Sequence, residues 1–106
     1  EALRLDEMFE HVLFMVETAK RAMKEENIEL ANVVLEEDNL LDEINADALR
    51  FLVDYAEQHP DKMRLCLELN GVFRKLERTG DHINNTMEDI IFYLNAKVLK
   101  HMGKHE

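Results

Sequence analysis

The stretch that decides the fold reads Lys75-Leu76-Glu77-Arg78-Thr79-Gly80-Asp81-His82-Ile83-Asn84-Asn85. It lies within a longer segment whose apolar residues, together with Gly80, recur at steps of three and four: Leu69, Val72, Phe73, Leu76, Ile83, Met87, Ile90 and Leu94. This spacing is typical of one helix face packed against other helices. Acidic and amide residues follow one shoulder of the same helix, at about 100° of rotation per residue: Asn70, Glu77, Asp81, Asn84 and Glu88. Such a shoulder can be a metal site, a docking surface or a solvated edge.

Helical periodicity continues through the rest of the chain and is interrupted at two places. The pattern predicts helices over about 3–25, 28–57 and 61–100, separated by breaks at Glu26–Asn27 and near His59–Asp61. Asn27 can cap a helix, and the residue before Pro60 avoids helical backbone angles. No strand-like alternation is present. We therefore predict an all-α fold, an antiparallel up-down-up three-helix bundle, as a single domain over residues 1–106.

Composition narrows the classes of partner. The 106 residues carry 23 acids against 13 Lys and Arg, a formal net charge of -10, which argues against nucleic acid and anionic membrane surfaces as partners. No run of about 20 apolar residues predicts a membrane span. The single Cys66 cannot form an internal disulfide and fits a reducing cytoplasm.

Two acid pairs stand out by position. Asp38/Asp42 and Glu77/Asp81 are each spaced by one helical turn, so each pair shares a helix face. Asp38 interrupts the apolar stripe of segment 28–57, as does Asn45, whereas the other acid pairs at this spacing resemble ordinary surface. A carboxylate at a helix interface is costly unless it is paired or coordinated.

The residues alone leave two interpretations of these pairs open. A hard cation bound by several oxygens would offset the repulsion within each pair. Alternatively, nearby basic side chains would form an ion-pair network with the acids: Arg74, Lys75, Arg78 and His82. Gly80, which costs about 1 kcal/mol relative to Ala within a helix, indicates close approach of either a helix or a ligand.

Antiparallel packing would place the two acid pairs at similar heights. About 17 residues separate Asp42 from the turn at Pro60, and about 17 separate Glu77 from it, so the mismatch is under one turn at about 1.5 Å per residue. Enzyme motifs are missing: the chain has no Glu-x-x-His, no Gly-rich phosphate loop and no His-Glu-x-x-His. We therefore expect a non-enzymatic protein.

The run Lys75-Leu76-Glu77-Arg78-Thr79-Gly80-Asp81-His82, followed by Asn85 and Glu88, resembles the signature of the PhoU family of phosphate-signalling regulators. The segment from Ala31 to Asp42 is similar to that family as well. Thr79 and Thr86 depart from the pattern, since a larger aliphatic residue is usual there, and we expect looser packing around them.

The resemblance implies a metal-binding adaptor between a phosphate transporter and a sensor kinase. Its implied metal ligands are Asp38 and Asp42 from one motif and Glu77 and Asp81 from the other, with Asn85 and Glu88 flanking them. The metal would be Mg, Mn, Fe, Zn or Ca. The partners would be the transporter ATPase and a sensor histidine kinase in the cytoplasm, where the protein acts as a negative regulator of phosphate-starvation genes.

The family is built from two tandem three-helix repeats, of which this sequence holds one. We expect it to be the C-terminal half of a longer protein and, because the missing repeat would leave a surface exposed, to form a homodimer. The alternative is a structural helical assembly domain without metal, such as a cytoplasmic appendage of a sodium/phosphate cotransporter.

Overall fold

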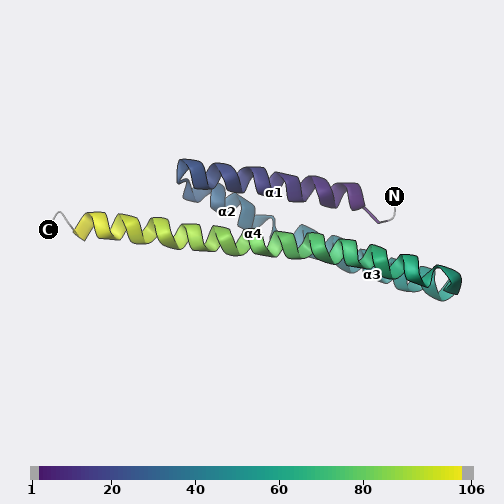
Figure 1. Cartoon of the computed structure of the whole chain (residues 1–106). Coiled ribbons are helices and arrows are strands. Elements are labelled where there is room, and N and C mark those ends of the chain that lie inside the picture. Colours follow the sequence, from purple (N-terminus) through teal and green to yellow (C-terminus); the bar gives the residue numbers. More distant parts are fainter. Residues whose placement is uncertain (1–2, 104–106) are drawn as a thin grey trace.

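The computed structural model describes residues 3–103, apart from the side chains of Asp38 and of residues 101–103. This part forms four α-helices and one short 3-10 helix: α1 (Leu5–Glu25), α2 (Ile28–Glu36), α3 (Asp38–Gln58), η1 (Pro60–Lys62) and α4 (Met63–Gly103). Helix α1 runs one way, α2 and α3 return as a second leg, and α4 runs back beside both (Figure 1). The predicted all-α, antiparallel up-down-up three-helix bundle is confirmed.

Helix α4 is the axis of the molecule. It is 41 residues long and accounts for most of the 70 Å length of a body only 17 × 16 Å across. Helix α3 lies along its N-terminal half, while α1 and α2 lie farther toward its C-terminal end (Figure 1). The last turns of α4 extend past the turn between α1 and α2.

The first predicted break is a capped turn. Glu26 adopts a left-handed conformation (φ 51°, ψ 49°) and its backbone N–H donates to the carbonyl of Ala22, which ends α1. The Asn27 side chain then accepts a hydrogen bond of 3.1 Å from the backbone N–H of Leu30, which begins α2. A side-chain oxygen at this position satisfies one of the amides that a helix start leaves without a partner.

The second predicted break lies at Pro60. His59 is extended (φ -133°, ψ 73°), as expected before proline, and η1 then leads into α4. Both predicted breaks are confirmed.

The prediction of one continuous helix over 28–57 is wrong at Glu37. That residue leaves the helical region (φ -93°, ψ 13°) and divides the second leg into α2 and α3. The consecutive acids Glu36, Glu37 and Asp38 give a physical reason: negative charge is unfavourable at the end of a helix and favourable at the start of one. The break is also held from outside, because Nε2 of His11 on α1 lies 3.1 Å from the Glu37 carbonyl oxygen and donates a hydrogen bond to it.

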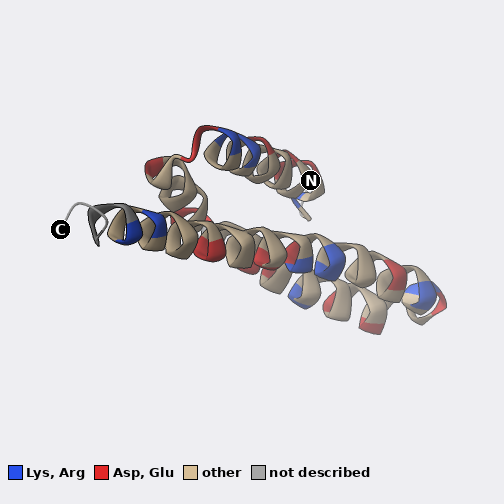
Figure 2. Cartoon of the chain, turned by 60° about the vertical axis from the view of Figure 1, so that its left-hand side comes forward, with Lys and Arg blue, Asp and Glu red and all other residues tan. Residues whose placement is uncertain are grey.

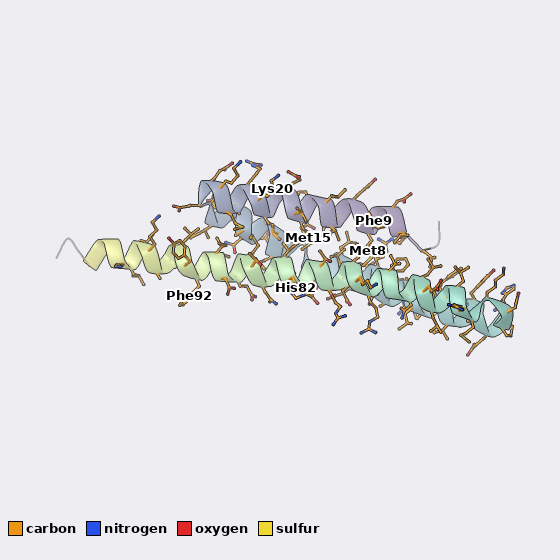
Figure 3. All side chains as sticks on the ribbon, viewed as in Figure 1. Met8, Phe9, Met15, Lys20, His82 and Phe92 are labelled. Atoms are coloured by element: carbon orange, nitrogen blue, oxygen red, sulfur yellow. The ribbon has the colours of Figure 1, made fainter. Side chains whose placement is uncertain are left out.

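The three legs meet at Gly80. A Cβ atom added to this glycine would overlap Cδ1 of Leu41 on α3 and would lie 3.7 Å from Cε of Met15 on α1. Met8 and Met15 point from α1 toward α4 (Figure 3). The buried residues of this main core come from all four α-helices: Met8, Val12, Met15, Ala19, Ala22, Ala31, Val34, Leu41, Ile44, Ala48, Phe73 and Met87.

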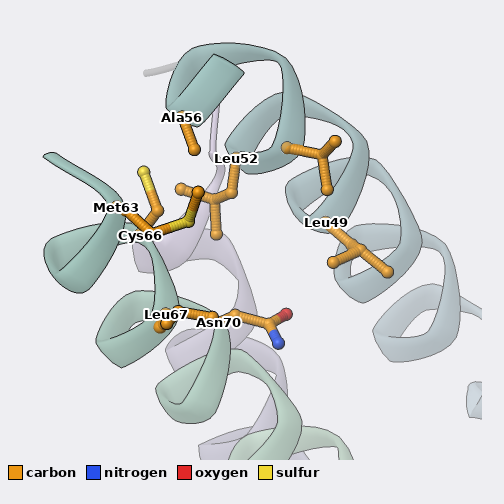
Figure 4. Close-up of a pocket in the computed structure, with 8 residues that line it drawn as sticks. Leu49, Leu52, Ala56, Met63, Cys66, Leu67 and Asn70 are labelled. Carbon is orange, nitrogen blue, oxygen red and sulfur yellow. The ribbon is translucent and has the colours of Figure 1, made fainter. Parts of the chain in front are cut away.

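A second, smaller core closes the α3–α4 hairpin. Leu52, Ala56 and Cys66 are buried there, and the Cys66 thiol is free. Beside them is a pocket of about 70 Å³, whose lining is apolar except for Asn70 (Figure 4).

A groove of about 330 Å³ lies between α1 and α4 at the two threonines that depart from the PhoU pattern. Each hydroxyl donates to the backbone carbonyl four residues earlier, at 2.9 Å for Thr79 and 3.0 Å for Thr86. Val16 and Met23 of α1 line the opposite side. The groove occurs where the sequence predicts looser packing.

Acidic residues are spread over the length of the bundle. The last described turns of α4 carry basic residues and no acidic ones (Figure 2). No helix in the described part of the chain combines the length and hydrophobicity that crossing a bilayer requires.

Candidate functional site

One acid of each predicted pair, Asp42 and Glu77, meets the other where α3 packs against α4. The carboxyl group of Glu77 on α4 donates a hydrogen bond to Asp42 on α3 when it is protonated, and Asp81 lies one turn farther along α4, close enough for its charge to act on Glu77. The antiparallel register therefore brings Asp42 level with Glu77, as the heights of the two motifs predict.

An amide completes this contact. Nδ2 of Asn45 on α3 donates a hydrogen bond of 3.3 Å to Oε1 of Glu77. Oδ1 of the same Asn45 is buried and has no hydrogen-bond partner within the described residues. A buried polar atom without a partner is costly, so this oxygen is a candidate for binding a proton donor or a cation. Asn45 was not among the predicted site residues, although its place within an apolar stripe was a signal.

The surroundings of Glu77 disfavour its negative charge. Partial burial is the largest cause, followed by the hydrogen bond and negative charge of Asp42 and the charge of Asp81, and together they raise the pKa of the Glu77 carboxyl from 4.5 to about 7. Arg74 acts in the opposite direction but does not cancel the effect. Below about pH 7, protonation of Glu77 therefore removes the repulsion between its carboxylate and that of Asp42.

The other predicted ligands lie farther from this contact. Asn85 is exposed two turns along α4 from Glu77, and Glu88 is exposed three turns along it. Asp38 is the first residue of α3, one turn before Asp42, and its side chain lies outside the described residues.

The donors around Glu77 are chemically suited to a hard cation. The Asp42 and Glu77 carboxylates and the Asn45 amide oxygen are the ligand types that Mg²⁺, Mn²⁺ and Ca²⁺ prefer. Mg²⁺ usually keeps several waters and takes only one or two carboxylates from the protein. Among the residues whose side chains are described, no group of three or more His, Cys, Asp or Glu is arranged to hold a metal ion. The site thus provides a partial oxygen shell.

Comparison with known proteins decides the family. The PhoU domain matches residues 5–90, which include all of the candidate site. The chain belongs to the PhoU family.

Several PhoU homologues align over most of this chain. The phosphate-specific transport system accessory protein PhoU homolog 1 of Thermotoga maritima is 32% identical over 96 residues, which are 91% of this chain and 41% of that protein. The corresponding PhoU homolog of Pseudomonas putida is 34% identical over 89 residues, covering 84% of this chain and 35% of that protein. The PhoU homolog of Pseudomonas aeruginosa is 33% identical over 89 residues.

The chain thus spans about two fifths of the length of the curated relatives that it matches. No solved structure gives a significant match.

Proposed function

We propose that this chain is part of a non-enzymatic regulator of phosphate uptake and phosphate-starvation signalling. The observation that carries the proposal is membership of the PhoU family, since the matched relatives are named as accessory proteins of the phosphate-specific transport system. The protein acts in the cytoplasm as an adaptor between the transporter ATPase and a sensor histidine kinase, and it keeps phosphate-starvation genes repressed.

A genetic experiment tests this role. Deleting the gene that encodes the chain is expected to raise alkaline phosphatase expression in phosphate-rich medium, and a plasmid copy should restore repression. Unchanged expression in the deletion strain would contradict the regulatory role.

The second part of the proposal is that a divalent or trivalent cation binds at the contact of α3 and α4. The support is local: burial and the neighbouring Asp42 raise the pKa of Glu77, as expected where negative charge lacks a counterion, and Oδ1 of Asn45 is buried beside Glu77 without a partner in the described part. Asp42, Glu77 and Asn45 would hold the ion, with Asp38 and Asp81 one turn away along their helices. The cation would neutralise the acids and join α3 to α4.

Binding of a cation to the folded state alone raises the melting temperature by mass action. We expect wild type to gain stability from Mg²⁺, Mn²⁺ or Ca²⁺ after treatment with a chelator. The double variant Glu77→Gln with Asp81→Asn should not respond. The matched control is Asp6→Asn with Glu10→Gln, which removes two exposed acids at the same spacing on α1 and should leave the response intact. An equal gain in the Glu77/Asp81 variant would show that these residues are not ligands.

The alternative function is a structural helical assembly domain without metal. It needs no metal ligands and agrees with the lack of a three-ligand His, Cys, Asp or Glu group among the described side chains, which do not include that of Asp38. Elemental analysis of protein purified without a metal-affinity column separates the two functions, because the assembly domain should carry no stoichiometric metal.

The third part of the proposal is self-association, most simply as a homodimer. Many large apolar side chains of the described part are at least one third exposed, including Leu13 on α1 and Phe92 on α4. Exposed apolar surface is a common feature of protein–protein interfaces where such side chains gather into one patch.

A further inference from the structure

The C-terminal part of α4 carries an apolar patch that no other helix of the described residues covers. Phe92 is 77% exposed, more than any other large apolar residue in the described part of the chain, and Leu99 is 69% exposed. Ala96 lies between them and is also exposed. At about 100° per residue, these three side chains share one face of α4. The labelled Phe92 lies on α4 near the end of α1 (Figure 3).

Two charges flank this patch on the same side. Asp89 lies before it and Lys100 after it, 11 residues or about three helical turns apart, so they fall almost on one line along the helix. Neither residue has an ion-pair partner among the described residues, whereas Lys97 is already paired with Glu26 at 3.1 Å. The tail patch, defined here as Asp89, Phe92, Ala96, Leu99 and Lys100, therefore has an acidic end, an apolar centre and a basic end.

Such a surface is complementary to itself. In an antiparallel pair of α4 helices related by a two-fold axis, each flank of one helix faces the same flank of the other. The acidic end of one copy then meets the basic end of the second. Isologous interfaces of two-fold dimers require this self-complementarity.

The apolar centre and the charges require the same register. Placing Phe92 of one copy against the small Ala96 of the other puts the two-fold axis at the height of Leu94. Pairing Asp89 with Lys100 puts the axis half a residue farther along, a difference of about 0.8 Å at about 1.5 Å per residue. One arrangement thus satisfies both contacts.

We propose that two copies of this chain associate in antiparallel fashion through the tail patch of α4, with Phe92 against Ala96 and Asp89 paired with Lys100. This inference rests on the proposed self-association and assigns it to a surface. Phe92, Ala96, Leu99 and Lys100 lie beyond residue 90, where the match to the PhoU domain ends.

A second copy fits the patch better than an anionic membrane does. The chain has a formal net charge of -10, and Asp89 lies at the edge of the patch, so an anionic lipid surface would repel both the protein and the patch margin. The patch covers only about three turns of one helix, which corresponds to a small interface and a weak, reversible dimer.

Sedimentation equilibrium of the chain over a range of micromolar concentrations tests the proposal. Wild type should show a monomer–dimer equilibrium, and Phe92→Ser should raise the dimer dissociation constant at least tenfold, since a central aromatic residue dominates such contacts. The matched control is Leu13→Ser, which removes an apolar side chain of 62% exposure from α1 and should leave the constant unchanged.

Charge exchange tests the register. Asp89→Lys alone and Lys100→Glu alone should each weaken the dimer, because each places like charges opposite one another. The double exchange should restore it. Circular dichroism melts would establish that all variants remain folded, which their exposed positions favour.

Different failures are distinguishable. A strictly monomeric wild type would overturn self-association and this inference together. A dimer that survives Phe92→Ser but dissociates with Leu13→Ser would keep self-association and overturn the tail patch as its surface. Flotation of a monomeric chain with phosphatidylglycerol vesicles, lost in Phe92→Ser, would assign the patch to lipid instead.

Discussion

Replacing Glu77 with Gln is expected to stabilise the protein above neutral pH and to remove much of its pH dependence. Glutamine keeps both contacts of Glu77, because its Oε1 accepts from Asn45 and its amide nitrogen donates to Asp42, as the protonated carboxyl does. It removes only the proton that is lost when pH rises. The variant thus measures how much the negative charge of Glu77 lowers the free energy of unfolding.

The direction in which stability changes with pH follows from the direction in which the pKa of Glu77 is displaced. Because the pKa of Glu77 rises from 4.5 to about 7 on folding, the folded state binds this proton more tightly than the unfolded state. The free energy of unfolding therefore falls as pH rises from about 4.5 to about 7, and the loss is complete above that range. At 1.36 kcal/mol per pKa unit the upper bound is about 3 kcal/mol. Solvent screening of a partly exposed carboxyl reduces this to about 1–2 kcal/mol.

The assay is thermal unfolding followed by far-UV circular dichroism in the presence of a chelator. At about pH 8, Glu77→Gln should melt roughly 5–10 °C above wild type, and at about pH 4 the two should nearly coincide. Glu88→Gln is the matched control, since Glu88 is exposed on the same helix and forms no ion pair within the described part. If the wild-type and Glu77→Gln melting temperatures differ by the same amount at every pH, the charge of Glu77 is not the cause.

Three further substitutions test the packing. Gly80→Ala should lower the free energy of unfolding by about 1–2 kcal/mol in urea, because the methyl group overlaps Leu41 and overpacking outweighs the gain in helix propensity; a higher urea midpoint would refute this. Asn27→Ala should cost about 1 kcal/mol by removing the cap on Leu30, and Asn27→Ser should recover most of it in the same assay. Leu76→Asp should cost several kcal/mol, since Leu76 packs against the core, and a wild-type melting temperature would contradict its place there.

The sequence predicted those breaks that carry local signals. Asn27 caps α2, and Pro60 restricts the backbone of His59 before it. Both turns are therefore determined by a few neighbouring residues. The break at Glu37 has no glycine or proline. It is fixed in part by a hydrogen bond from His11, which is 26 residues away in sequence and becomes a neighbour only when α1 packs against the second leg.

The geometry of the candidate site, like the helix breaks, could be predicted from the sequence only in part. Helical spacing and equal distance from the Pro60 turn placed Asp42 level with Glu77, and the structure joins them. The pattern showed that Asn45 interrupts an apolar stripe but not which side chain it meets, because that depends on the register between α3 and α4. Glu88 shares the shoulder of Glu77, yet three helical turns separate the two residues.

Gly80 connects the packing of the bundle with the chemistry of the site. Leu41 approaches α4 at Gly80, and Asp42 follows Leu41, while Glu77 and Asp81 flank Gly80 on α4. The contact of Leu41 with Gly80 therefore lies directly beside the contact between Asp42 and Glu77. A methyl group at position 80 should move α3 outward, separate these carboxyl groups and return the pKa of Glu77 toward 4.5. Titration of the Glu77 side-chain carboxyl by NMR in wild type and Gly80→Ala measures this directly. A lowered stability with an unchanged pKa would show that the helix contact and the acid pair are independent; a lowered pKa would show that one glycine controls both.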